Sequence, residues 1–455
     1  MASYLYRQTT VPTSEKKFTI STWMKISADT SVEKGIIEWY RSANDRYQVL
    51  IDTTGKMRIH SQVGGSTGIN IYTDMLFRDP SAWYHIVIHN DTAEGSATDR
   101  FKLWVNGEAQ TFSTYSYTYN GSNINCFDGT SGDAVNVGVR DETSSKFFDG
   151  CLADTYYVDG SLIAYTQFGQ TDSTSGIWKP NTSPTISSFG NAGFHLKYEN
   201  SGNLGLDSSG NSLNMTASGT LTQNVDTPSK NYNTLNPIIY STSGVTLAHG
   251  NTSFNSGSGV QYGFAIPSFA LNKGRWYFES KIGHTCAGLY IGDTNQVVEA
   301  VRNSTRIGVG SQQYSWECNG NFQNNNSQTS YGSTAAANDI IGMFVDLEDN
   351  KLYIAVNGTI QNSGTGFSIT DPASTETGFY YVGGIADQCS ATANVTAEMN
   401  YGGGKFGVTA ISSAQADANG EGIFEYSPNQ GGASNFDSAA KNFYALNTKN
   451  IKEFG

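Results

Sequence analysis

Two acidic side chains near position 350 have the spacing of a catalytic pair. Asp346 and Glu348 are two residues apart at the end of an apolar stretch that predicts a strand, so both carboxylates are expected on one face. Glycoside hydrolysis needs two carboxyl groups at a defined separation across a cleft. No third acid extends the alternation along this strand, and the pair lies at a predicted turn. We therefore expect no catalytic role here.

Other catalytic patterns are equally weak in this sequence. His85 and His89 are four residues apart on a predicted strand and share a face, but no further metal ligands accompany them, which favours sheet histidines. The sequence has no G-x-S-x-G elbow, and the Gly402–Gly404 triplet lacks the Lys-Ser/Thr of a phosphate loop. The prediction is a protein that is not an enzyme.

Calcium is the one cofactor that the sequence leaves open. Asp207 and Asn211 bracket the segment D-S-S-G-N, whose oxygens are the hard ligands that Ca²⁺ prefers. Asp128, Asp133 and Asp141 offer similar oxygens in the long loop before the closing strands of the first domain. Asp and Asn also favour turns without any metal, so an ordinary Asx-turn is the preferred interpretation.

Tyrosines alternate with small polar residues between positions 114 and 120. On a strand this pattern places Tyr115, Tyr117 and Tyr119 on one face, with Asn120 at its end. Tyr and Asn offer amphipathic contact surface of low conformational entropy, which suits a sugar or a protein partner. Packing inside the protein or against a neighbouring subunit is the alternative. A second aromatic- and amide-rich segment, 312–331, contributes the candidate binding residues Tyr314, Trp316 and Asn319.

The elements that would position these residues are strands. In N-D-I-I-G-M-F-V-D-L-E-D-N-K-L-Y-I-A-V-N-G, 340–347 reads as a strand buried on both faces and 352–356 as its partner, closed by Asn357-Gly358. The segment F-K-L-W-V-N-G at 101–107 repeats this pattern. Each copy is preceded by a strand that opens with Trp-Tyr. The repetition predicts two all-β sandwiches in tandem.

The remaining strands and helices are predicted from local pattern. Residues 18–26 alternate as a half-exposed strand, and 193–198 read as a lone strand that docks on the first sandwich. No long window has helical periodicity. Short helices are predicted at 408–418 and 436–445.

The first half of the chain resembles the laminin-G/concanavalin-A-like jelly roll. The matching motifs are F-T-I-S-T-W-M-K, W-Y-H-I-V, F-K-L-W-V-N-G and F-D-G-C-L-A-D-T-Y-Y-V-D-G, in that order. They are most similar to the version found at the start of tailed-phage virion proteins, where a phenylalanine and W-K-P also follow. This resemblance implies a domain over residues 1–180.

The second half resembles a SPRY domain, a compact sandwich used for recognition. G-R-W-Y-F-E, A-G-L-Y-I-G, I-G-V-G, the stretch at 338–358 and G-F-Y-Y-V follow in order, with Asn338 where the family usually has glycine. The expected divisions are a bridge over 181–237 that packs on the first domain, the SPRY domain over 238–404 and a C-terminal strap over 405–455. The ending F-Y-A-L-N-T-K-N-I resembles a terminal motif of phage structural proteins.

Composition and charge limit the classes of binding partner that the chain is expected to have. The formal net charge of −13 and the absence of a basic stripe disfavour nucleic-acid binding. We expect no secretory signal and no membrane insertion, because no apolar run is long enough. The five cysteines lack zinc spacing. Buried free thiols are the expected state, with a bridge between Cys126 and Cys151 as the alternative.

Together these features predict a non-enzymatic structural protein of a phage virion. The resemblance implies a tail fibre or tip component that recognises a host surface glycan or protein, made in the host cytoplasm and carried on the virion beside other virion proteins. A capsid-decorating or capsid-fibre protein is the alternative, and a polysaccharide-degrading enzyme a remote one. By analogy with fibres, a homotrimer is expected.

Overall fold

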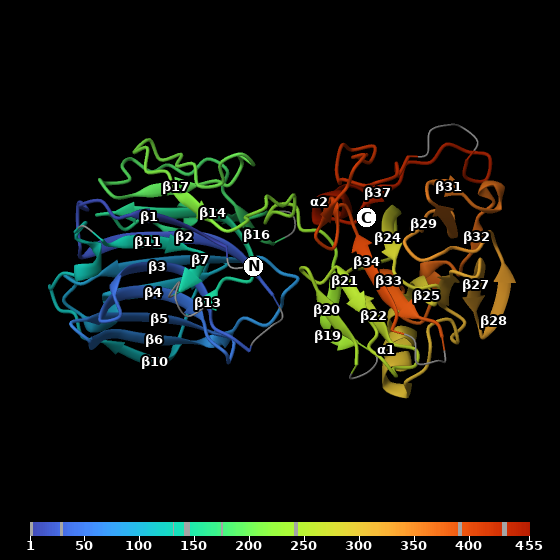
Figure 1. Cartoon of the computed structure of the whole chain (residues 1–455), viewed down its shortest axis with the longest axis horizontal. Helices are drawn as coiled ribbons and strands as arrows, with labels where there is room; N and C mark the ends of the chain where they lie inside the picture. Colours follow the sequence, from blue (N-terminus) through green and yellow to red (C-terminus); the bar gives the residue numbers. More distant parts are fainter. Residues whose placement is uncertain are drawn as a thin grey trace. The chain divides into compact units, whose positions relative to one another are not determined.

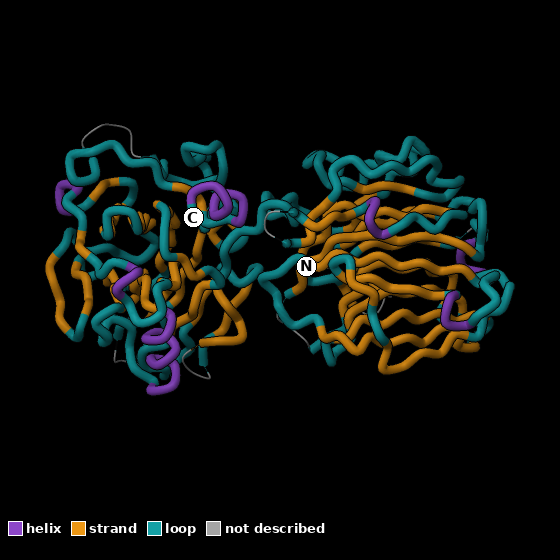
Figure 2. Tube along the Cα trace, turned by 180° about the vertical axis from the view of Figure 1, so that it is seen from behind, coloured by secondary structure: helices purple, strands orange, loops and turns teal. Residues whose placement is uncertain are grey.

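The computed structural model describes residues 3–27, 31–130, 132–140, 146–173, 176–240, 244–389, 394–429 and 435–455. The chain forms two compact units, Met1–Ser229 and Lys230–Gly455. Strands dominate both units, and the helices among the described residues are short (Figures 1 and 2). Each unit is a β-sandwich, so the predicted pair of all-β sandwiches is confirmed.

The first unit packs an eight-stranded sheet against a six-stranded sheet. The order of the larger sheet is β10 (Phe112–Tyr117), β6 (Ser66–Leu76), β5 (Lys56–Val63), β4 (Asp45–Ile51), β3 (Lys34–Ser42), β11 (Ala134–Val137), β1 (Tyr4–Gln8) and β18 (Thr216–Ser218). The order of the smaller sheet is β17 (Phe194–Leu196), β14 (Gly150–Asp159), β2 (Lys17–Ile26), β7 (Tyr84–Asp91), β8 (Phe101–Val105) and β9 (Glu108–Ala109). Two separate strand pairs are β12 (Val139–Arg140) with β13 (Lys146–Phe147), and β15 (Gly169–Thr171) with β16 (Trp178–Pro180).

An aromatic cluster fills the core between these sheets. Phe18 of β2 lies within 4.9 Å, centroid to centroid, of Phe127 and within 5.8 Å of Tyr157. Trp39 and Tyr47 pack against the same rings from the larger sheet. Because alternate residues of each strand point inward, period-2 spacing of apolar residues builds this core.

Strand β2 is buried on both faces, whereas the alternation in its sequence predicts a half-exposed strand. The chain segments that follow β14 in sequence cover the outer face of β2. Thr19 donates to the carbonyl of Ser161, and the Trp23 ring stacks on His85, which in turn accepts a hydrogen bond from Trp178. The polar residues of this face form hydrogen bonds within the protein instead of facing water. The local sequence pattern cannot reveal that this face is covered.

The bridge adds strands to both sheets of the first unit. β17 pairs with β14, and β18 pairs with β1. The first unit ends at Ser229, so residues 230–237 lie with the second unit, where Leu235 is fully buried.

The second unit also packs two sheets. One runs β19 (Leu235–Tyr240), β22 (Phe264–Pro267), β33 (Tyr380–Asp387), β25 (Ala287–Asp293), β26 (Gln313–Glu317), β27 (Asn321–Asn324) and β28 (Ser327–Ser330), with β23 (Ala270–Leu271) beside β33. The other runs β20 (Thr246–Ala248), β21 (Ser253–Asn255), β34 (Thr396–Asn400), β24 (Arg275–Ile282), β29 (Ile340–Asp346), β30 (Lys351–Val356) and β31 (Thr359–Ile360), with β32 (Phe367–Ser368) beside β30 and β37 (Tyr444–Ala445) beside β24. A further pair is β35 (Lys405–Phe406) with β36 (Thr409–Ala410).

The two Asn-Gly turns form as their sequence predicts. Asn106 and Gly107 have φ values of 50° and 82°, and Asn357 and Gly358 have 46° and 77°. Both central residues are left-handed, as a tight hairpin turn requires. An aromatic ring packs over each glycine, Trp178 over Gly107 and Tyr426 over Gly358.

The C-terminal segment lies on the second sandwich, and neither predicted helix in it forms. Asp437 and Ser438 have φ values of 50° and 63°, which interrupt a right-handed helix over 436–445, and Ala445 is drawn into the sheet beside Tyr277. Over 408–418 the backbone bonds to distant segments instead, as where the Gln415 amide donates to the Phe424 carbonyl. Phe436 and Phe443 cover Phe344, which explains why β29 is buried on both faces.

Two α-helices are present among the described residues. α1 (Thr294–Asn303) begins at Asp293, whose carboxylate accepts from the amides of Asn295 and Gln296. α2 (Thr448–Phe454) begins at the N-cap Asn447. Sequence periodicity predicts neither. No helix in the described ranges has the length and apolar character needed to cross a membrane.

The cysteine prediction is wrong at one pair. Cys286 and Cys389 form a disulfide, because the antiparallel pairing of β25 with β33 brings their Cα atoms to 5.4 Å. Cys126, Cys151 and Cys318 are not in disulfides, so Cys126 and Cys151 are not bridged to each other. The two partners are 103 residues apart in sequence, and only the sheet order pairs them.

Candidate ligand-binding site

A bulge in β14 turns a carboxylate toward a hollow in the first unit. The pairing of β14 with β2 shifts register between Ala153 and Tyr156, and Asp154 at the shift has a φ of 46°. A non-glycine residue in this conformation is strained, and bulges commonly re-aim a side chain. The Asp154 side chain is 39% exposed.

His195 lies beside this carboxylate on the neighbouring strand. Its Nε2 is 3.2 Å from Oδ1 of Asp154, and its ring stacks on Tyr156 at 3.8 Å between centroids. The backbone amide of His195 donates to Asp207, which fixes the strand on its other side. Burial raises the pKa of Tyr156, so its phenol stays neutral. The imidazole edge of His195 and the Asp154 carboxylate thus form a hydrogen-bonded polar pair.

The pair opens into a hollow of about 320 Å³, which we call the polar hollow. Its wall mixes hydrogen-bonding groups with a few apolar surfaces, as small-molecule sites do. Lys197, whose side chain is 43% exposed, adds a cation. The lining residues are Asp154, Tyr156, Asn181, Thr182, Ser183, Pro184, Ile186, Phe189, His195, Lys197 and Ser208.

The Asp154–His195 pair has two of the three groups of a nucleophilic triad. A triad also needs a hydroxyl or thiol hydrogen-bonded to the imidazole. Within the described parts of the chain, no serine, threonine or cysteine side chain hydrogen-bonds to the His195 ring. The exposed Asp154 carboxylate can accept hydrogen bonds from the hydroxyl groups of a ligand.

A second cavity of about 420 Å³ lies between the bridge and the sheets of the first unit. Trp83, Phe148 and Leu152 give it apolar walls. At its edge Asp226 is held by Lys25 at 2.7 Å and by the Trp83 indole at 3.1 Å. These two contacts fix the Asp226 carboxylate at the edge of the cavity.

The tyrosine strip faces the core of the first sandwich. Tyr117 and Tyr119 are 8% and 7% exposed, and their hydroxyls bond to Asn90 and Ser61. Tyr115 packs on the same core and donates to the carbonyl of Ala97. The three rings share one face, as the alternation predicts, but that face is internal. Asn120 remains exposed and accepts from Arg100.

The candidate residues of the second unit are also mostly internal. Trp316 is fully buried and Tyr314 is 3% exposed, because β26 is a central strand of its sheet. Asn319 is exposed in the turn after β26, where it donates to Glu317. The binding role predicted for Tyr117, Tyr119, Tyr314 and Trp316 requires exposed side chains. All four are buried in the structure, so the expectation that they are exposed is wrong.

The calcium candidates have other partners. Although burial acts to raise the pKa of Asp207, the amides of His195, Ser209 and Leu213 hold it below its usual value. Asn211 turns its amide nitrogen to the carbonyls of Gly190 and Gly193. These contacts are those of the Asx-turn preferred from the sequence.

The second calcium candidate is occupied by a cation of the protein itself. Asp128 and Asp133 both pair with the guanidinium of Arg41. Asp141 lies outside the described residues.

The acids and histidines with catalytic spacing also have partners. Asp346 is fully buried against Arg275 and Lys441, while Glu348 is exposed and accepts from the Gly274 amide, so the two do not form a pair. His85 bonds to Ser21 and Trp178, and His89 to the Ile163 carbonyl.

Asp154 and His195 were missed as site residues by the sequence patterns. One signal was available: Asp154 is a charged residue inside the run C-L-A-D-T-Y-Y-V, where a regular strand of this length would bury it. No sequence signal pairs it with His195, 41 residues later, because that contact depends on β17 docking on β14.

Two family models match the sequence. Residues 3–164 match the Concanavalin A-like lectin/glucanases superfamily (Laminin_G_3), and residues 275–402 match the SPRY domain. The chain thus carries a concanavalin A-like domain followed by a SPRY domain. These matches suggest a ligand-binding module.

Similar solved structures align with about a third of the chain. The SPRY domain of human HERC1 has 13% identity and a TM-score of 0.29, covering 36% of this chain and 96% of that chain. A SAP-like pentraxin from Limulus polyphemus has 17% identity and a TM-score of 0.27, covering 36% and 72%. The TRIM65 PSpry domain has 10% identity and a TM-score of 0.28, covering 37% and 88%. No curated protein matches the sequence.

Proposed function

We propose that this chain is a non-enzymatic structural protein of a tailed-phage virion, a tail fibre or tip component that binds a host surface glycan in the polar hollow. The observation that carries the binding proposal is the strained Asp154 beside His195 at the opening of the polar hollow. The order of the phage-like motifs in the sequence supports the virion assignment.

The chemistry of the polar hollow suits a sugar. The free oxygen of the Asp154 carboxylate accepts hydrogen bonds from hydroxyl groups, and the ammonium of Lys197 donates to them. Phe189 and Ile186 supply apolar wall for the C–H face of a pyranose ring. A homotrimer would present three such hollows, so that weak single contacts add through multivalency.

Binding to host polysaccharide by the full chain tests this site. Asp154→Asn should weaken binding at least tenfold, because a carboxylate hydrogen bond is roughly twice as strong as a neutral one. Asp99→Asn is the matched control, since Asp99 is 51% exposed in the same unit and carries the same charge. Equal binding by both variants would place the glycan elsewhere, and loss of polysaccharide chain length on incubation would contradict the non-enzymatic assignment.

A capsid-decorating protein is the second candidate, and one feature favours it. β28 (Ser327–Ser330) is an edge strand whose four residues are all exposed, and such edges accept strands from neighbouring chains. Immunogold labelling of phage particles separates the two. Gold at the tail supports the receptor-binding proposal, and gold over the head supports decoration.

A further inference from the structure

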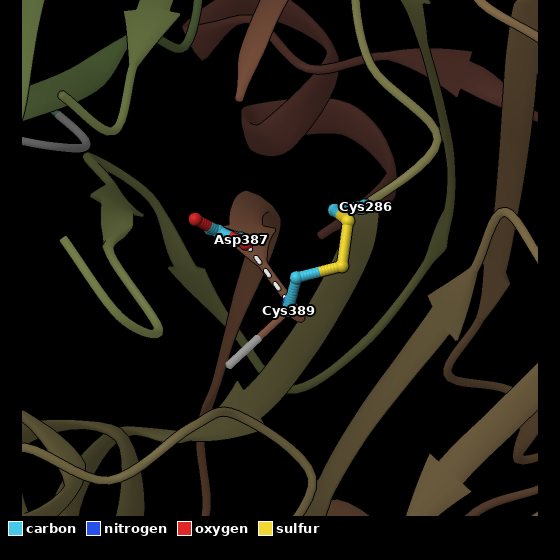
Figure 3. Close-up of side chains that lie close together, drawn as sticks. All are labelled: Cys286, Asp387 and Cys389. Carbon is cyan, nitrogen blue, oxygen red and sulfur yellow. Dashed lines mark hydrogen bonds between the residues drawn. A yellow bond between two sulfur atoms is a disulfide. The ribbon is translucent and has the colours of Figure 1, made fainter. Parts of the chain in front are cut away.

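Two neighbouring strands of the second unit carry the same short pattern of metal-type ligands. His284-Thr285-Cys286 leads into β25, and Asp387-Gln388-Cys389 starts at the last residue of β33, Asp387. Each pattern places a His or Asp two residues before a cysteine. Because Ala287 pairs with Asp387 across the strands, the two patterns meet at one end of the sheet (Figure 3).

Three of these side chains form one compact cluster. A sulfur of Cys286, a sulfur of Cys389 and a carboxylate oxygen of Asp387 all lie within 4.8 Å of one another. Two thiolates on one zinc ion, each at about 2.3 Å, are roughly 3.8 Å apart in tetrahedral geometry. After reduction, two sulfurs at this distance would still lie within the 4.8 Å that separates the atoms of the cluster.

Asp387 is a fully buried carboxylate beside the disulfide. Its Oδ1 accepts from the Cys389 amide at 2.9 Å. The Ser256 hydroxyl and the His284 imidazole are its other polar neighbours. Neither of these neighbours carries a permanent positive charge, whereas buried carboxylates are normally paired with a cation or bound to a metal.

We propose that, when the disulfide is reduced, Cys286, Cys389 and Asp387 bind one zinc-type divalent cation, and that the disulfide and the metal site are alternative states of the same residues. A phosphine reductant supplies the two electrons that break the S–S bond, water supplies the two protons, and the phosphine becomes its oxide. The cation then replaces the two thiol protons, which are released to solvent, and forms two metal–sulfur bonds. Asp387 supplies the third ligand and water the fourth.

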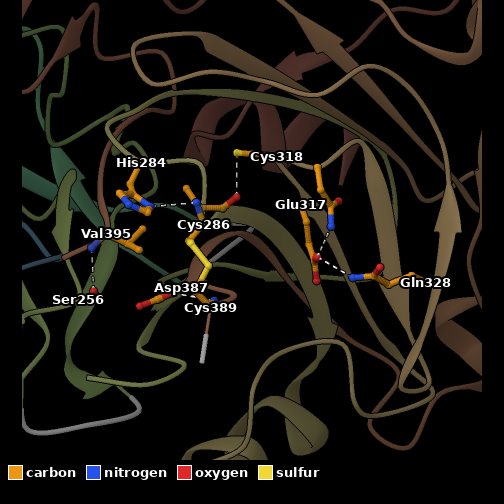
Figure 4. Close-up of a disulfide and its surroundings, with 11 residues drawn as sticks. Ser256, His284, Cys286, Glu317, Cys318, Gln328, Asp387, Cys389 and Val395 are labelled. Carbon is orange, nitrogen blue, oxygen red and sulfur yellow. Dashed lines mark hydrogen bonds between the residues drawn. A yellow bond between two sulfur atoms is a disulfide. The ribbon is translucent and has the colours of Figure 1, made fainter. Parts of the chain in front are cut away.

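Figure 4 shows the side chains around the cluster, which are compatible with both the disulfide and the metal site. The Cys286 amide donates to Nδ1 of His284 at 3.1 Å, which holds the loop before β25 beside the cluster. Cys318 lies nearby on the adjoining strand end but stays outside the cluster, since its thiol donates to the Ala287 carbonyl. It is a buried thiol outside the cluster, and it serves as the matched control.

Cobalt titration of the full chain tests the proposal. In the presence of a phosphine reductant, the protein should bind one Co²⁺ per chain with thiolate-to-cobalt charge-transfer absorption, and Zn²⁺ should displace it. The oxidised protein should give no such absorption. Absence of the absorption in the reduced protein would overturn the proposal.

Variants locate the ion. Asp387→Asn keeps both thiols and the side-chain volume, and it should lower cobalt affinity at least tenfold. Cys286→Ser should abolish the charge-transfer signal, and Cys318→Ser should leave it unchanged. If Cys286→Ser does not fold, as judged by circular dichroism, Asp387→Asn decides the matter. Wild-type affinity in Asp387→Asn, or loss of signal in Cys318→Ser, would refute the assignment.

Discussion

The indole Nε1 of Trp178 donates a hydrogen bond to Nδ1 of His85 at 3.0 Å. The other ring nitrogen, Nε2, lies 2.9 Å from the Ser21 hydroxyl and therefore carries the proton. This fully enclosed imidazole joins the covering segment that contains Trp178 to the smaller sheet of the first unit. Its neutral state makes that connection sensitive to acid.

Acid should destabilise the first unit through His85. Burial lowers the pKa of His85 to about 3, against 6.5 in an unfolded chain. The unfolded chain therefore binds the proton more tightly, so the stability contribution is full above pH 6.5 and is lost as pH falls toward 3. The free energy of unfolding should fall by about 1 kcal/mol per pH unit in that window.

Urea unfolding of the full chain at a series of pH values measures this slope. His85→Gln should flatten it, with a residual slope from His60, whose pKa burial lowers to about 4. An unchanged slope in His85→Gln would contradict the assignment.

The second unit should respond to pH in the opposite direction. Burial raises the pKa of Glu279 to about 7, although Asn400, Tyr277 and two backbone amides hydrogen-bond to its carboxylate. The folded state thus holds the proton more tightly than the unfolded chain. The contribution is full below about 4.5 and is lost as pH rises through about 7, a loss of about 3 kcal/mol.

Glu279→Gln mimics the protonated side chain and should remove this dependence. The measurement is the unfolding midpoint of the second unit between pH 5 and pH 8, for the variant and the native chain. Parallel pH profiles would show that Glu279 does not titrate in this range.

The ion pairs around β29 should differ sharply in their contribution to stability. Asp346 is fully buried and contacts Lys441 at 2.8 Å and Arg275 at 3.0 Å, whereas Asp349 pairs with the same cations at 50% exposure. Breaking a buried pair leaves an uncompensated charge, and exposed pairs contribute little. Asp346→Asn should cost about 3 kcal/mol and Asp349→Asn less than about 1 kcal/mol. Equal unfolding free energies for the two variants would refute this ranking.

Two glycines with the same backbone angle separate steric fit from backbone strain. Gly358 has a φ of 77° and Gly378 of 78°. A Cβ on Gly358 would meet the Tyr426 ring at 2.5 Å, whereas one on Gly378 has open space. Gly378→Ala should cost about 1 kcal/mol for the left-handed backbone, and Gly358→Ala about 1–3 kcal/mol more. Thermal unfolding of the full chain compares them, and a Gly378→Ala variant as unstable as Gly358→Ala would show that the Tyr426 contact is unimportant.

Local pattern was enough to predict the sandwich class and its turns. Apolar runs such as 340–347 predict strands because side chains alternate across a sheet, and Asn-Gly predicts a turn because both residues tolerate positive φ. These are properties of a few consecutive residues. The structure contains the predicted strand as β29 and the predicted turn at Asn357-Gly358.

Tertiary packing decided which faces are exposed and which distant residues meet. The tyrosine alternation at 114–120 is the same on a surface or over a core. Only the packing of this segment on the core of the first sandwich places Tyr117 and Tyr119 inside. The pairing of Cys286 with Cys389 follows from the order of β25 and β33. The Asp154–His195 pair follows from a bulge and from the docking of β17. Contacts between residues 41 or 103 positions apart are set by sheet order, which no window of sequence contains.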